Sequence, residues 1–156
     1  MLSDERLTEL KSRVRALPHP EEALVDVLHA LQDACGYLTD EAMEYAADIV
    51  GVHPARAEGV ATFYNLFYRR PVGNKVIHVC DSISCWATGM DEVFNHIKTR
   101  LGVDVGGTTP DGAFTLLPIC CLGACHEAPA MMVGGKIYGN LTRERIEQIL
   151  EEERTT

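Results

Sequence analysis

Cys80-Asp-Ser-Ile-Ser-Cys85 and Cys121-Leu-Gly-Ala-Cys125 are the two stretches that decide how this chain is interpreted. They form two cysteine pairs, C-x4-C and C-x3-C, separated by residues 86–120. Four thiolates on two short loops are the usual protein share of an iron–sulfur cluster. Such a chain would move single electrons and would need no catalytic residues of its own.

The composition indicates a globular protein with acidic character. The chain has 156 residues, of which 46% are hydrophobic and 24% charged, and its net charge is −9. The acidity argues against nucleic acid as a partner and against an anionic membrane surface. No apolar run approaches the roughly 20 residues of a spanning helix, and the N-terminus resembles no signal or transit peptide. We therefore expect a cytoplasmic chain without direct membrane insertion, whose six cysteines serve metal or redox chemistry.

Residues 1–72 are predicted to form an N-terminal helical domain. Ser3 is a plausible N-cap for a first helix, and Thr39 and Gly51 would delimit a third. Pro54 is expected to open a fourth helix, because proline is favoured in a first helical turn. In the second helix, Cys35 continues the apolar face of Leu24–Leu31 and is interpreted as a small core residue.

Residues 73–156 change to a mixed strand and helix pattern. The predicted order is a strand at 75–79, a helix at 86–101, a strand at 113–119, a hairpin at 130–138 and a helix at 141–153. Gly134-Gly135 would form the two-residue hairpin turn. The order β-α-β-β-β-α indicates an α/β sandwich of thioredoxin type.

The cysteine pairs admit other interpretations. A structural zinc site also uses four thiolates, but its pairs are typically C-x2-C. A thioredoxin-like dithiol needs C-x-x-C, which is absent, and unliganded buried cysteines remain the simplest alternative. Cys120 and Cys121 are adjacent, so in an extended chain only one of them can face a cluster, and geometry alone leaves that choice open. His126 could be a Rieske-type ligand, although four cysteines already fill the site.

Three aromatic residues could serve packing or binding. Phe63, Tyr64 and the single tryptophan, Trp86, are interpreted as packing residues, with contact to a partner as the alternative. Neither a G-x-G-x-x-G motif nor a P-loop is present, so the sequence shows no nucleotide or flavin site of its own.

Several motifs together resemble one family. They are Ala61-Thr-Phe-Tyr64, Cys80–Cys85, Thr108-Thr-Pro-Asp-Gly112, Leu117-Pro-Ile-Cys-Cys-Leu-Gly-Ala-Cys125 and Glu127-Ala-Pro-Ala-Met-Met132. With these motifs the chain resembles the thioredoxin-like [2Fe–2S] subunit of the NADH dehydrogenase module of respiratory complex I, the NuoE family. The likeness spans nearly the whole chain and is densest between residues 59 and 142.

The resemblance implies a ligand set and a setting. In the C-L-G-x-C pattern the first cysteine aligns with Cys121, which gives Cys80, Cys85, Cys121 and Cys125 as ligands of one [2Fe–2S] cluster. The implied fold is of α+β or α/β class, a helical bundle (1–72) followed by a thioredoxin-like [2Fe–2S] ferredoxin domain (73–156). The implied partner is a flavoprotein subunit that carries FMN, the NADH site and a [4Fe–4S] cluster, within NADH:quinone oxidoreductase. The chain would then be a cytoplasmic electron-transfer subunit, peripheral to the inner membrane through the complex.

Three alternatives to complex I remain open. Related subunits occur in NAD-linked formate dehydrogenases and in hydrogenases, and the sequence does not separate these parent complexes. The alternative from a different functional class is a zinc-stapled structural adaptor. A [2Fe–2S] protein is red-brown and a zinc protein is colourless, so colour would distinguish the two.

Overall fold

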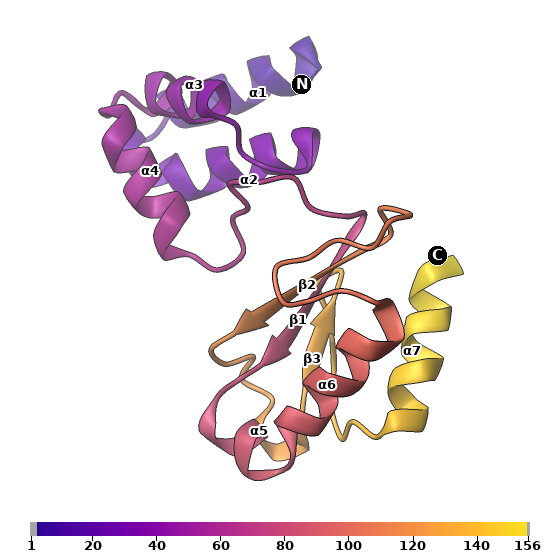
Figure 1. Ribbon diagram of the computed structural model, residues 1–156. Helices are drawn as coiled ribbons and strands as arrows, with labels where there is room; N and C mark the ends of the chain where they lie inside the picture. The colour runs from indigo at the N-terminus through magenta and orange to yellow at the C-terminus, as the bar shows by residue number, and fades with distance from the viewer. Residues whose placement is uncertain (1–2, 156) are drawn as a thin grey trace. The chain divides into compact units, whose positions relative to one another are not determined.

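The computed structural model describes residues 3–155, and the chain divides into two compact units (Figure 1). We call Met1–Pro71 the helical unit and Val72–Thr156 the sheet unit. The predicted fold class, helices followed by a mixed helix and sheet domain, is confirmed.

Within residues 3–71, four α-helices build the helical unit, as predicted. They are α1 (Asp4–Arg15), α2 (Leu24–Cys35), α3 (Asp40–Val50) and α4 (Pro54–Phe63), and a short 3-10 turn, η1 (Pro20–Ala23), precedes α2. Side chains of Ser3 and Thr39 accept hydrogen bonds from the first turns of α1 and α3, which satisfies main-chain donors that a helix leaves unpaired. Gly36 and Gly51 follow α2 and α3 in the left-handed conformation that glycine adopts most readily.

Cys35 is exposed, so its predicted place in the core is wrong. It is the last residue of α2, and Gly36 turns the chain away immediately after it. The buried face of α2 therefore ends one turn earlier, at Leu31 and Gln32. The apolar core of the unit is formed by Leu10, Val14, Leu24, Val27, Leu28, Leu31, Leu38, Met43, Ala46, Ala47, Val50, Ala57, Ala61 and Phe67, with Ala23.

Gln32 anchors the segment that follows α4. Its side chain is buried, its amide nitrogen donates to the carbonyl of Leu66 at 2.7 Å, and its amide oxygen accepts from the main-chain N–H of Tyr68 at 2.7 Å. The guanidinium of Arg69 adds bonds to the carboxylates of Asp40, at 2.6 Å, and Glu58, at 3.0 Å. The segment from residue 64 to residue 69 is thereby tied to α2, α3 and α4.

Replacing Gln32 with leucine is expected to destabilise the helical unit by about 2 kcal/mol. The apolar side chain would remove the partner of the Leu66 carbonyl and of the Tyr68 N–H, both in partly buried hydrogen bonds, and losing the partner of a buried group costs about 1–3 kcal/mol. Gln148→Leu on the exposed face of α7 is the matched control and should change stability by less than about 0.5 kcal/mol. Denaturant unfolding followed by far-ultraviolet circular dichroism measures both, and equal midpoints would contradict the anchoring role.

The sheet unit has four strands in the order β2-β1-β3-β4. The strands are β1 (Lys75–Cys80), β2 (Phe114–Ile119), β3 (Met131–Val133) and β4 (Lys136–Tyr138). β1 pairs in parallel with β2 and antiparallel with β3, while β3 and β4 form the predicted hairpin through Gly134 and Gly135. The helices are α5 (Ile83–Ala87), α6 (Met90–Leu101) and α7 (Arg143–Thr155), with a 3-10 turn, η2 (Cys125–Glu127).

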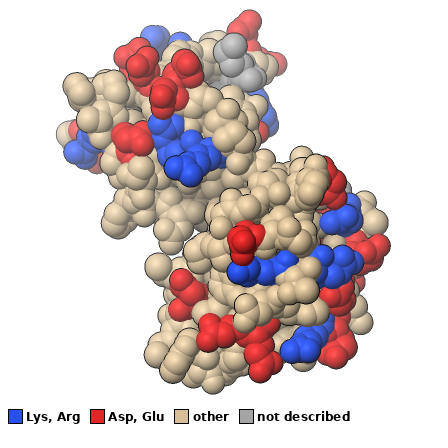
Figure 2. All heavy atoms as spheres, in the orientation of Figure 1, with Lys and Arg blue, Asp and Glu red and all other residues tan. Residues whose placement is uncertain are grey.

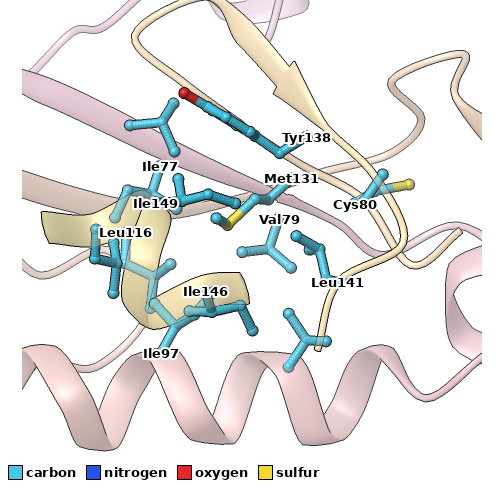
Figure 3. Packing of buried hydrophobic residues seen from close by; sticks show 14 of the residues in the cluster. Ile77, Val79, Cys80, Ile97, Leu116, Met131, Tyr138, Leu141, Ile146 and Ile149 are labelled. Carbon is cyan, nitrogen blue, oxygen red and sulfur yellow. The ribbon is translucent and has the colours of Figure 1, made fainter. Parts of the chain in front are cut away.

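The core of the sheet unit lies between the sheet and the helices α6 and α7. Figure 3 shows Ile97 of α6 and Ile146 of α7 beside Val79 and Met131 of the sheet, and these residues belong to one buried cluster. Cys80 lies at the edge of that cluster, with its sulfur turned away from Met131. The packing therefore fixes the main chain of Cys80 while its sulfur faces the end of the sheet.

The predicted helix at 86–101 is two helices in the structure. α5 ends at Ala87, and Gly89, with φ of 96°, separates it from α6. A left-handed residue interrupts the hydrogen-bond pattern of a continuous helix. The spacing of apolar residues does not record backbone conformation, so it did not reveal the break. The closing helix also differs slightly, because α7 begins at Arg143 and ends at Thr155.

The Thr108–Gly112 motif lies where β2 begins, at the opposite end of that strand from Cys120. The hydroxyl of Thr109, a buried residue, accepts from the N–H of Phe114 at 3.0 Å. Main-chain N–H groups of Asn74 and Lys75 donate to the carbonyls of Gly112 and Ala113. This motif therefore holds the start of β1 against the start of β2 and takes no part in the cysteine site.

Two further features are the charged side chains on the surface and the length and apolar character of the helices. On the face shown in Figure 2, lysine and arginine side chains are interspersed with acidic ones. Within residues 3–155, no helix combines the length and the apolar character that a membrane crossing requires.

Candidate metal centre

The pairing of β1 with β2 brings the two cysteine loops to one edge of the sheet. The strands are parallel, Cys80 is aligned with Ile119, and the chain continues from Ile119 into Cys120 and Cys121. The N–H of Asp81 donates to the carbonyl of Ile119 at 3.0 Å, which extends the pairing beyond the strands. Both loops therefore leave the sheet from the carboxyl ends of neighbouring parallel strands.

Cys80 and Cys85 form the buried half of the site. Their exposed fractions are 2% and 1%. The N–H of Cys80 donates to the carbonyl of Ala130 at 3.1 Å, and Cys85 lies within α5, immediately after the turn that leaves β1. Burial raises the pKa of Cys85, and the thiol of Cys80 contributes to raising it, as expected for two neighbouring thiols.

Cys121 and Cys125 form the exposed half of the site. Their sulfur atoms lie 3.8 Å apart, and the N–H of Gly123 donates to the sulfur of Cys121 at 3.4 Å. Gly123 has φ of 76°, a conformation that aims its N–H back at Cys121 and that residues with a side chain rarely adopt. The thiol of Cys80 donates to the carbonyl of Cys120 at 3.8 Å, next to Cys121, and this contact joins the two halves.

The two halves differ in how readily they hold negative charge. Burial, followed by the hydrogen bond with Cys80, raises the pKa of Cys85 to about 11. The N–H of Gly123, followed by the thiol of Cys125, lowers the pKa of Cys121. Metals bind thiolates, not thiols, so the lowered pKa of Cys121 favours the form that binds a metal. Cys85 is buried, so its thiolate needs a cation beside it to offset the cost of burying a charge.

The four thiols fit a cluster with two metal atoms. They form one group at the end of the sheet, in which, after burial, both Cys80 and Cys125 raise the pKa of Cys85 and, after the N–H of Gly123, both Cys125 and Cys80 lower that of Cys121. The sulfurs of Cys121 and Cys125 lie 3.8 Å apart, which is roughly the separation of two thiolates that share one tetrahedral metal at about 2.3 Å. Among the residues that the structure describes, no three His, Cys, Asp or Glu side chains gather closely enough to hold one metal ion. A [2Fe–2S] core takes two protein ligands on each iron, and this donor set suits it.

Cys120 and His126 are close in sequence to the four cysteines but are not part of their group. Cys120 is exposed, and its main-chain carbonyl accepts from the thiol of Cys80 at 3.8 Å. The side chain of His126 is 78% exposed, and its Nε2 lies 3.8 Å from a carboxylate oxygen of Glu127.

Two aromatic residues predicted to pack are instead exposed. Phe63 is 76% exposed and Trp86 is 59% exposed, so the packing interpretation is wrong for both. Tyr64 is half exposed, and the rings of Phe63, Tyr64 and the buried Phe67 meet edge to face at 5.1 and 6.3 Å between centroids. At the cysteine site, Ile83 is 72% exposed, one turn of chain from Trp86. No periodic pattern could have distinguished these residues from core residues of the same type.

A comparison with protein families identifies the family of this chain. The family model of the thioredoxin-like [2Fe-2S] ferredoxin matches residues 10–154. The chain belongs to this family. Members of the family hold one [2Fe–2S] cluster, so this chain carries one, and the zinc alternative is not supported. The match also confirms the resemblance that the sequence motifs indicated.

Curated relatives of this family member are subunits of larger enzymes. The E subunit of NADH-quinone oxidoreductase from Pseudomonas aeruginosa is 36% identical over 151 residues, which cover 97% of this chain and 91% of that protein. The E subunit of the Escherichia coli K12 enzyme is 40% identical over 132 residues, 85% of this chain and 80% of the relative. The NADP-reducing hydrogenase subunit HndA of Solidesulfovibrio fructosivorans is 40% identical over 144 residues, 92% of this chain and 84% of HndA.

A solved structure shares the fold. The NAD+-reducing [NiFe]-hydrogenase in its air-oxidised state aligns with a TM-score of 0.69 at 24% identity, over 83% of this chain and 23% of the hydrogenase chain. At that identity the likeness shows the fold alone. The aligned part, 83% of this chain, is longer than either of its two units. The alignment therefore includes residues of both units, which match part of a longer chain.

Proposed function

We propose that this chain is the electron-transfer [2Fe–2S] subunit of an NADH:quinone oxidoreductase, the NADH dehydrogenase of complex I, and accepts single electrons from the FMN of a partner flavoprotein. The observation that carries the proposal is the meeting of the two cysteine loops at one edge of the sheet. The near full-length likeness to the Pseudomonas aeruginosa relative supports the choice of parent enzyme.

The ligands in this proposal are Cys80, Cys85, Cys121 and Cys125. When bound, the cluster supplies reversible one-electron oxidation and reduction. Cys80 and Cys85 exclude water from one side, while the N–H of Gly123 donates to the sulfur of Cys121 and favours its negative charge. The exposed pair, Cys121 and Cys125, marks the side from which a partner can exchange electrons with the site.

The partner is proposed to be a flavoprotein that carries FMN, the NADH site and a [4Fe–4S] cluster. Phe63, Tyr64 and Leu66, which we call the aromatic patch, are exposed on a segment that Gln32 and Arg69 hold in place. Rigid exposed aromatic residues are typical anchors of protein interfaces. The helical unit would dock through this patch, and the complex would hold this cytoplasmic chain at the inner membrane.

A hydrogenase is the second candidate for the parent enzyme. HndA is as similar to this chain, at 40% identity, as the Escherichia coli relative is, and both are covered over most of their length. The same four ligands and the same flavoprotein contact would serve either enzyme. Purification of the native complex with its partner subunits distinguishes them, because only one of the two assemblies contains a hydrogenase subunit.

Loss of the cluster is expected to change peroxide release more than NADH oxidation. The partner's flavin takes two electrons from NADH and passes them on one at a time. A one-electron site beside the flavin can hold the second electron after the first has left along the main electron-transfer path. The flavoprotein is reconstituted with the Cys125→Ser chain, and ferricyanide reduction by NADH is compared with peroxide formation. The wild-type chain is the control. Collapse of NADH oxidation, with flavin and the partner's own cluster intact, would place this cluster on the obligatory path and contradict the side role.

A further inference from the structure

Gly139 approaches the turn that carries Cys125 more closely than any other residue type could. It follows β4 and is buried, and a Cβ atom at this position would lie 2.3 Å from the Cβ of Glu127 and 2.8 Å from its carbonyl oxygen. Contacts of a Cβ below 3.0 Å essentially never occur in proteins. Gly139 is not among the glycines with positive φ, so it is needed for space and not for an unusual backbone conformation.

Main-chain hydrogen bonds hold the two segments together. The N–H of Asn140 donates to the carbonyl of Glu127, and the N–H of Leu141 donates to the carbonyl of Pro129 at 3.2 Å. Glu127 is the last residue of η2, which begins at Cys125, and its own N–H donates to the carbonyl of Ala124 at 3.0 Å. The chain after β4 is therefore a support on which the Cys125 turn rests.

We propose that Gly139 is a positioning residue for the cluster. By lacking a side chain, it lets the chain after β4 lie against Glu127 and sets where the sulfur of Cys125 stands, 3.8 Å from that of Cys121. This inference rests on the proposed ligand set. A side chain at residue 139 must displace main chain on one side or the other. The Glu127 carboxylate oxygen at 2.7 Å could swing away, but the Cβ at 2.3 Å and the carbonyl oxygen at 2.8 Å move only with the main chain.

The test compares Gly139→Ala with Gly73→Ala in the full-length chain. A Cβ at Gly73 would lie 2.9 Å from the carbonyl of Gly112 and 3.0 Å from the main chain of Phe114, which is a similar clash at the other end of β2. Both variants should melt at lower temperature. Only Gly139→Ala should release its iron to a chelator about tenfold faster and show an altered electron paramagnetic resonance spectrum and midpoint potential.

A compensating substitution makes the test specific. Glu127→Gly in the Gly139→Ala background removes the Cβ at 2.3 Å and the carboxylate oxygen at 2.7 Å but leaves the carbonyl oxygen at 2.8 Å, so it should bring the spectrum and the rate of iron release part of the way back to those of the wild type. If Gly139→Ala yields no folded protein, the double variant carries the test. Recovery of a cluster-bearing double variant supports the proposal, and failure to recover one overturns it.

Three results separate this inference from the ligand assignment. If Cys125→Ser loses the cluster while Gly139→Ala keeps the wild-type spectrum, potential and release rate, only the role of Gly139 is wrong. Equal spectral changes in Gly139→Ala and Gly73→Ala would also overturn it. If Cys125→Ser retains a wild-type cluster, the ligand set itself fails.

Discussion

Serine in place of any one of the four proposed ligand cysteines is expected to reduce bound iron and acid-labile sulfide at least about tenfold. Serine oxygen is a poor ligand for iron in a sulfide cluster, which prefers soft thiolates. Substitutions that merely disturb a ligand's support already cost about 10–100-fold in metal affinity, so removal of a ligand should cost no less. The four residues are Cys80, Cys85, Cys121 and Cys125.

Cys35→Ser and Cys120→Ser are the matched controls for this experiment. Both residues are exposed, so a hydroxyl at either position stays in water and the fold should tolerate it. Iron and sulfide per chain are assayed after reconstitution. The assignment that the C-L-G-x-C pattern implied would be overturned if Cys120→Ser lost iron while Cys121→Ser kept it.

Phe63→Ala is expected to weaken binding to the flavoprotein partner by about 2 kcal/mol, or roughly 30-fold. The side chain is 76% exposed, so its removal should leave the stability of the free chain almost unchanged. In a complex, however, the ring would be buried against the partner, and buried aromatic residues dominate interface energies. Titration of the labelled chain with the purified flavoprotein measures the affinity.

Leucine variants supply the matched pair for the aromatic patch. Leu66 and Leu17 are both 40% exposed in the helical unit, but only Leu66 belongs to the patch. Leu66→Ala should therefore weaken the complex, and Leu17→Ala should leave it unchanged. Unaltered affinity of Phe63→Ala and Leu66→Ala would show that the partner binds elsewhere on this chain.

Local features of the sequence were sufficient for most of the secondary structure. Ser3 and Thr39 cap helices because their hydroxyls reach main-chain donors only a few residues away. Gly134 and Gly135 form the hairpin turn because glycine accepts the left-handed conformation there without strain. The motifs around the cysteines likewise indicated the family by themselves. Each of these signals lies within a few residues of the feature that it predicts.

The tertiary structure decided which residues meet and which face water. The parallel pairing of β1 with β2 brings Cys80 to the segment that carries Cys120 and Cys121, and no spacing within either loop records that approach. Exposure of Cys35 depends on where the helical core ends, which periodicity along α2 does not record. The contact of Gly139 with Glu127 joins two loops through space. These outcomes depend on contacts between segments far apart in the chain, and such contacts leave no local signature because they are selected by packing of the whole unit.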